Sequence, residues 1–281
     1  MHLTGWLGLA AAALGALLAI ERHHPASRLA VVREPVTGQW LWTARDRQLF
    51  ERARESHPTL AASVLIGNVD CVGSSLHLRR GLSPVSAGLT PRALIVRLDD
   101  SLQRCLERDA DATAQALNQA LAKLLREVKD TGVSFSELQL DYDSPVSKLP
   151  AYARLLRSLK QGSLRGVELW ITSLPVHVEQ PGYGELMRDH VAGHILQLFD
   201  TGLQCDPALA EKLRAALAAQ ALPYRLGYGA FERRGAPASR SHACWPALTA
   251  AWRRDAGASG WWLFPAGMGY EQSLSQLVLS P

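Results

Sequence analysis

Short apolar runs alternate along the chain with longer stretches whose apolar residues recur at helical spacing. Each short run has the length of a β-strand and ends in polar residues, glycine or proline. Eight strands are predicted on this basis, at 38–43, 60–71, 92–99, 137–145, 166–175, 194–202, 223–231 and 260–267. Helices are predicted between them, at 45–56, 110–129, 147–160, 183–191, 206–220 and 245–255. The segment 72–90 is rich in Ser, Gly and Pro and has no clear period.

Repeated strand–helix units are typical of α/β proteins with a parallel sheet. Eight such units within residues 38–281 suit a closed (β/α)8 TIM-type barrel, which typically needs about 250 residues. An open doubly wound sheet is the alternative. No G-x-G-x-x-G motif follows a strand, so the usual sequence signature of nucleotide binding is missing.

The segment 3–20 is a continuous apolar run without charged residues. It is long enough for the hydrophobic part of a signal peptide or for a marginal membrane span. We interpret residues 1–21 as a signal peptide or an N-terminal membrane anchor, and 22–37 as a linker. The protein is then expected in the periplasm or another extracytoplasmic compartment, either free or anchored in the inner membrane. An amphipathic or buried helix is the alternative, but the run lacks a polar face.

The bulk composition narrows the function classes. The chain has 281 residues, of which 47% are hydrophobic and 20% charged, and its formal net charge is +4. No run of Lys and Arg is interleaved with aromatic residues, so nucleic-acid binding is not expected. Eight tryptophans are more than a core needs. They suit a groove that stacks on sugar rings, although barrel interiors also pack tryptophan.

Candidate chemistry concentrates in the strand at 137–145, ELQLDYDSP. Its leucines and tyrosine fall on one side of an extended strand, and Gln139, Asp141 and Asp143 fall on the other. In a barrel this polar side points inward, and Asp143 lies nearest the C-terminal rim, where TIM barrels carry their catalytic groups. Two neighbouring carboxylates raise each other's pKa. Asp143 is therefore the candidate general acid, and Asp141 would orient it.

Structural interpretations compete with this one. The two aspartates could lie on a solvated sheet edge, or Asp141 could pair with Arg97 of the neighbouring strand. Asp200, at the tip of the sixth strand, is the best second carboxylate, but it precedes Thr-Gly and could cap a turn. Glu232, just past the seventh strand, is the other candidate.

Five residues near strand ends are predicted to line the cleft and bind substrate. They are Trp42, Trp170, His177, Tyr228 and Trp262. The alternative for each tryptophan is a place in the core. His190 and His194 straddle a helix end and lack the Glu of an H-E-x-x-H zinc motif. No metal or other cofactor is therefore predicted.

Several stretches carry a family resemblance, namely LQLDYDSPVSKLPAYARLLRSLK, ELWITSLP, HILQLFDTG, YRLGYGAF and GWWLFPAG. Together they resemble a bacterial family known as domain of unknown function 3142, over roughly residues 38–267. That family is grouped by similarity with glycoside-hydrolase-like TIM barrels, and its activity is unassigned. The resemblance therefore implies the barrel more than it implies the chemistry.

Asp141-Tyr142-Asp143 is also similar to the D-x-D core of the chitinase-type D-x-x-D-x-D-x-E strand. Leu138 stands in place of the first Asp, and Pro145 stands in place of the catalytic Glu. Two functions stay open. One is an exported carbohydrate-active enzyme, glycoside-hydrolase-like, that acts on an envelope or extracellular polysaccharide through rim carboxylates. The other is a barrel that binds a glycan or serves in assembly without cleaving it.

The four cysteines, Cys71, Cys105, Cys205 and Cys244, follow the second, third, sixth and seventh strands. In a barrel their loops lie at the same end, and an exported protein meets an oxidising compartment. Loops after neighbouring strands then favour the pairs Cys71–Cys105 and Cys205–Cys244. Four free thiols are the alternative.

Overall fold

The computed structural model describes residues 36–84, 88–201, 203, 205–230, 241–265 and 269–279. The predicted N-terminal segment at 3–20 and most of the linker at 22–37 lie outside these ranges. Their interpretation as a signal peptide or anchor stays a prediction. Among the residues described, no helix is both long enough and apolar enough to cross a lipid bilayer.

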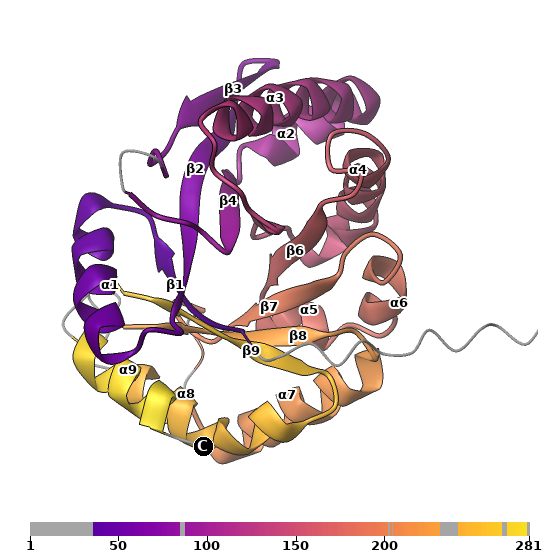
Figure 1. Ribbon diagram of the computed structural model, residues 1–281. Helices are drawn as coiled ribbons and strands as arrows, with labels where there is room; N and C mark the ends of the chain where they lie inside the picture. The colour runs from indigo at the N-terminus through magenta and orange to yellow at the C-terminus, as the bar shows by residue number, and fades with distance from the viewer. Residues whose placement is uncertain are drawn as a thin grey trace, which may run out of the picture. The chain divides into compact units, whose positions relative to one another are not determined.

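Eight parallel strands form a closed barrel, with helices on the outside (Figure 1). The strands are β1 (Val36–Leu41), β2 (Ala61–Val72), β4 (Ala93–Leu98), β5 (Glu137–Asp141), β6 (Glu168–Ser173), β7 (Gly193–Gln197), β8 (Tyr224–Gly229) and β9 (Ala258–Phe264). Each pairs in parallel with its neighbours, and β1 pairs with both β9 and β2, which closes the ring. The predicted (β/α)8 TIM-type barrel is confirmed, and the open doubly wound sheet is excluded.

One strand was not predicted. β3 (Ser75–Arg80) runs antiparallel to the C-terminal half of β2. It lies within the segment 72–90, whose sequence shows no clear period. Gly73 supplies the turn between β2 and β3 with φ +62°, a conformation that favours glycine. Leu76 and Leu78 pack against the apolar core between strands and helices, and Ser75, His77 and Arg79, which alternate with them, are polar. The alternation is therefore present, but it spans only six residues.

The helices follow the prediction closely where they are long. They are α1 (Ala44–Ser56), α2 (Leu102–Arg108), α3 (Ala110–Asp130), α4 (Leu149–Gln161), α5 (Pro175–Val178), α6 (Tyr183–Met187), α7 (Pro207–Gln220), α8 (Ser241–Leu248) and α9 (Tyr270–Leu279). The start of α7 is as expected, because the Asp206 side chain accepts a hydrogen bond from the Leu209 N–H and Pro207 occupies the first turn. The helix predicted at 245–255 is replaced by α8 and a separate 3-10 turn, Ala250–Arg254.

The strands separate two apolar cores. The outer core lies between strands and helices and contains Leu138, Leu140 and Tyr142 of the ELQLDYDSP segment. The inner core fills the barrel itself with Trp40, Leu65, Ile95, Trp170, Ile195 and Trp262. The barrel interior is thus packed, as in other TIM barrels, and open space is left to its rim.

Both predicted disulfides are present. Cys71 pairs with Cys105 at a Cα–Cα distance of 6.0 Å, and Cys205 pairs with Cys244 at 6.2 Å. The expected loop placement holds only for Cys205, because Cys71 lies near the end of β2, Cys105 in α2 and Cys244 in α8. Each bond still joins the ends of neighbouring barrel strands or the segments that follow them, β2 with β4 and β7 with β8. The predicted pairing, Cys71 with Cys105 and Cys205 with Cys244, is confirmed.

Replacing Cys71 and Cys105 by alanine should lower the free energy of unfolding by about 2–4 kcal/mol, because the bond closes a long loop and restricts the unfolded chain. The two cysteines are 34 residues apart. Urea denaturation of the double variant beside the wild type measures the difference. An unchanged denaturation midpoint would show that the bond is not formed in solution.

Candidate functional site

A pocket of about 150 Å³ lies at the C-terminal end of the barrel. Its lining residues come from the inward side of the strands or from just beyond their ends. They are Trp40, Trp42, Ile95, Arg97, Gln139, Asp141, Asp143, Thr172, Leu174, Gln197, Phe199, Asp200 and Phe264. The pocket therefore brings together three of the four predicted carboxylates and one of the predicted aromatic residues.

Asp141 is the deeper carboxylate, with its side chain 15% exposed. The Thr172 hydroxyl donates a hydrogen bond to it at 3.1 Å, and the Arg97 Nε lies 3.9 Å from its Oδ2. Burial, followed by the charge of Asp143, raises the pKa of Asp141 to about 6, and Arg97 opposes this shift. The pairing with Arg97 is present, but the Arg97 side chain is 44% exposed, so this is not a buried ion pair.

Asp143 lies at the pocket mouth and is exposed. The Gln197 amide donates a hydrogen bond to its Oδ1 at 3.2 Å. Partial burial of the carboxyl among its neighbours raises the pKa of Asp143, and the charges of Asp100 and Asp200 act in the same direction. Arg97 and the bond from Gln197 oppose the rise. The two strand aspartates thus share one pocket at different depths, as the alternation predicted.

Asp200 also lines the pocket, just past the end of β7. Its backbone has φ 49°, in the left-handed region that residues other than glycine seldom adopt. Such conformations are often found at functional sites, and they also occur in turns. Glu232, the fourth predicted carboxylate, lies outside the described residues.

Aromatic rings form much of the pocket wall. Trp42 packs against Phe264 at a centroid distance of 5.0 Å, and the guanidinium of Arg97 lies 5.2 Å from the Trp42 ring centroid. Phe199 and Phe264 stack at 5.8 Å, and Trp40 lies beside both. The sequence reasoning missed Trp40, Phe199 and Phe264. Strand alternation could have found Trp40 and Phe264, because they lie two residues from the candidates Trp42 and Trp262.

Four of the residues predicted to line the cleft do not reach the pocket. Trp170 and Trp262 are buried in the inner core, below the rim. Tyr228 faces the outer core, where its hydroxyl bonds to Thr249. His177 is buried, with one ring nitrogen 2.7 Å from the Ser144 carbonyl and the other accepting from the Leu174 N–H. The predicted placement of these four side chains is wrong.

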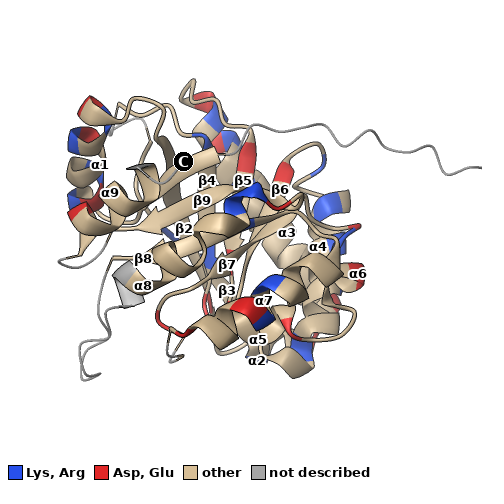
Figure 2. Ribbon diagram, turned by 90° about the horizontal axis from the view of Figure 1, so that it is seen from below, with Lys and Arg blue, Asp and Glu red and all other residues tan. Residues whose placement is uncertain are grey.

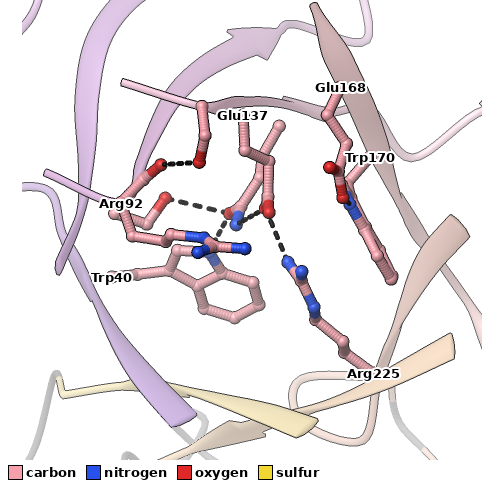
Figure 3. A network of polar contacts seen from close by, with 9 residues as sticks. Trp40, Arg92, Glu137, Glu168, Trp170 and Arg225 are labelled. Carbon is pink, nitrogen blue, oxygen red and sulfur yellow. Dashed lines mark hydrogen bonds and ion pairs between the residues drawn. The ribbon is translucent and has the colours of Figure 1, made fainter. Parts of the chain in front are cut away.

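A buried polar network lies beneath the pocket, inside the barrel (Figure 3). Arg225 Nη1 pairs with Glu137 Oε1 at 2.6 Å, and both side chains are almost fully buried. Glu137 in turn accepts a hydrogen bond from the Gln139 amide at 2.7 Å. The sequence held a signal for this pair. Glu137 lies on the same inward side of its strand as Asp141, and Arg225 is a charged residue within an apolar strand.

Figure 2 shows Lys and Arg interspersed with Asp and Glu on the same outer helices, such as α1 and α7. Within the described part of the chain, no group of three or more His, Cys, Asp or Glu residues is arranged to hold a metal ion.

The raised pKa of Asp141 should appear in the pH dependence of stability. Asp141 ionises near pH 3.8 in the unfolded chain and at about 6 in the folded one. The native state should therefore lose stability as the pH rises from 4 to 6, by at most about 3 kcal/mol. Asp141→Asn should remove most of this loss, leaving a smaller slope from Asp143. Urea denaturation at four pH values tests this, and equal slopes in wild type and variant would contradict it.

The fold and the pocket together define a class of protein: a TIM-type barrel with aspartates at its C-terminal rim. Residues 89–225 of this chain match the family described as Domain of unknown function (DUF3142). This match confirms the resemblance seen in the sequence. No curated protein matches the chain.

Solved structures share the barrel at low sequence identity. The spore cortex-lytic enzyme SleL of Bacillus cereus is 14% identical with a TM-score of 0.57, over 88% of this chain and 74% of that one. A chitinase of Chromobacterium violaceum is 11% identical with a TM-score of 0.61, over 88% and 100%. The xylanase and alpha-amylase inhibitor protein of Scadoxus multiflorus is 13% identical with a TM-score of 0.55, over 88% and 99%. These likenesses establish the fold.

Proposed function

We propose that this protein is a carbohydrate-active enzyme that hydrolyses a glycosidic bond in the rim pocket, with Asp143 as the general acid. One observation carries the proposal: two carboxyl groups with raised pKa values face the same aromatic-walled pocket. A general acid must keep its proton near the working pH, and glycosidases commonly achieve this with a carboxyl group in a partly dry, negatively charged site.

Residues near Asp143 suit the other roles that glycoside hydrolysis requires. Glycoside hydrolysis usually needs a second carboxylate across the scissile bond. Asp200 lines the same pocket and is the candidate base or nucleophile, and the charges of Asp100 and Asp200 help to keep Asp143 protonated. The face of Trp42 offers a surface on which a sugar ring can stack.

We further propose that the protein works outside the cytoplasm, on an envelope or extracellular polysaccharide. The two disulfides support this, since such bonds persist in oxidising compartments. Two of the structural neighbours are named as a lytic enzyme and a chitinase, which makes peptidoglycan and chitin the first substrates to test.

The test is to incubate the purified protein with peptidoglycan, chitin, xylan and β-glucan and to measure new reducing ends. The wild type should release them from at least one polysaccharide. Asp130→Asn is the matched control for a substitution of Asp143, because Asp130 is exposed at the C-terminal end of α3 and does not line the pocket. If the wild type released no more sugar than a heat-denatured sample from all four, the enzymatic proposal would fail.

Glycan binding without cleavage is the second candidate, and one observation favours it. Pro145 stands where the chitinase-type strand carries its catalytic Glu, and it lies beyond the end of β5, outside the strand. Binding alone predicts that chitotetraose or a similar oligosaccharide is retained intact after long incubation. Mass spectrometry of the recovered ligand separates the two candidates.

A further inference from the structure

The indole of Trp40 lies at the inner end of the pocket. It is 4% exposed, and its ring stacks on Trp262 with an angle of 13° between the planes. Its Nε1–H donates a hydrogen bond to Gln139 Oε1 at 2.7 Å. An indole N–H is a donor only. The orientation of the Trp40 ring therefore depends on which end of the Gln139 amide faces it.

The orientation of the Gln139 amide is set from the other side. Its nitrogen donates to Glu137 Oε1 at 2.7 Å, and its oxygen accepts from both Trp40 and Ser63, the latter at 3.0 Å. An ionised carboxylate only accepts hydrogen bonds. Glu137 thus requires the nitrogen end of the amide, which leaves the oxygen end for Trp40.

Arg225 completes the chain of contacts. Its Nη1 lies 2.6 Å from Glu137 Oε1, and its guanidinium lies 3.6 Å from the ring centroid of Trp170. Figure 3 shows Arg225 and Glu137 pointing toward one another inside the ring of strands, with Trp40 nearby. A guanidinium only donates hydrogen bonds, so Arg225 holds Glu137 Oε1 as an acceptor. The chain of hydrogen bonds from Arg225 through Glu137 and Gln139 therefore fixes which atom of Gln139 accepts from Trp40.

We propose that Gln139 is a positioning residue which, held by the Arg225–Glu137 ion pair, fixes the Trp40 indole as the floor of the substrate pocket. The inference rests on the proposed function, because it assigns to this network the shape of the surface that meets the glycan. It assigns no contact with the reacting atoms to Arg225 or Glu137.

The test compares Gln139→Met with Ser63→Ala. The first removes the acceptor for the Trp40 indole in a side chain of similar length. The second removes the other donor to the same oxygen and leaves the bond from Trp40 in place. Tryptophan fluorescence titration with chitotetraose gives the affinity, and ¹⁵N NMR gives the indole N–H signal of Trp40, assigned with Trp40→Phe.

Gln139→Met should shift the Trp40 indole signal and weaken chitotetraose binding about tenfold or more, since a buried donor loses its partner. Ser63→Ala should keep the signal in place and the affinity within about twofold. Glu137→Gln, which keeps the shape of the side chain but lets it donate, should also shift the signal. It serves as the second variant if Gln139→Met does not fold.

The NMR comparison needs no glycan, so it separates this inference from the proposed function. A wild type that binds no glycan would refute the function alone. A Trp40 indole signal that stays unchanged in both Gln139→Met and Glu137→Gln would overturn the inference. An affinity that falls equally in Gln139→Met and Ser63→Ala would also overturn it, because that pattern indicates a general loss of packing.

Discussion

Arg225→Met should lower the free energy of unfolding by about 3–5 kcal/mol, because it leaves an ionised carboxylate buried without its partner. The side chains of Arg225 and Glu137 are 2% and 0% exposed. Their bond links β8 to β5 across the barrel interior, so its loss acts on the centre of the fold. Chemical denaturation monitored by circular dichroism measures the change.

Two comparisons show whether the effect comes from the uncompensated charge. Lys212→Met breaks an exposed ion pair with Glu179, in which the lysine is 64% exposed, and should change stability by less than about 1 kcal/mol. Arg225→Met combined with Glu137→Leu removes both charges and should recover most of the lost stability. If Arg225→Met proved as mild as Lys212→Met, the buried pair would not have the strength assigned to it.

Asp143→Asn should reduce polysaccharide turnover by about 10²–10⁴-fold, the range expected when a general acid is lost. The melting temperature should stay close to that of the wild type, because the side chain is exposed and an asparagine oxygen can still accept the hydrogen bond from the Gln197 amide. Amide and carboxyl groups have nearly the same shape, so the pocket should keep its form. Reducing-end assays and thermal unfolding on the same preparation give both values.

Asp130→Asn is the control for Asp143→Asn and should retain full turnover. Asp143→Asn with undiminished turnover would remove Asp143 from the mechanism. A variant that instead melted many degrees lower would assign Asp143 a structural role, and the loss of activity would then say nothing about acid catalysis.

Strand alternation explains why much of the fold and part of the site could be predicted. It placed Leu138 and Leu140 toward the helices and the two aspartates into the barrel, and the structure agrees. The repeated strand–helix order then fixed which loops are neighbours. That knowledge was enough to pair Cys71 with Cys105 and Cys205 with Cys244.

Strand alternation predicts which side of the sheet a side chain faces, but it does not predict how far along the barrel axis the side chain lies. Trp170 lies in the middle of β6 and points inward, so it fills the inner core, whereas Leu174, just past the end of that strand, reaches the pocket. Tyr228 is a different error, because it belongs to the outward row with Leu226. The exact end of each strand, which the sequence leaves uncertain by a few residues, decides which side chains reach the rim.

The most direct test of the central claim is a crystal structure of Asp143→Asn soaked with chitotetraose or with a fragment of the polysaccharide that the wild type cleaves. We expect a sugar ring in the rim pocket against Trp42, with a glycosidic oxygen within hydrogen-bonding distance of the side chain at position 143. A ligand bound at another surface, or one in the pocket whose linkages all lie far from positions 143 and 200, would contradict the account.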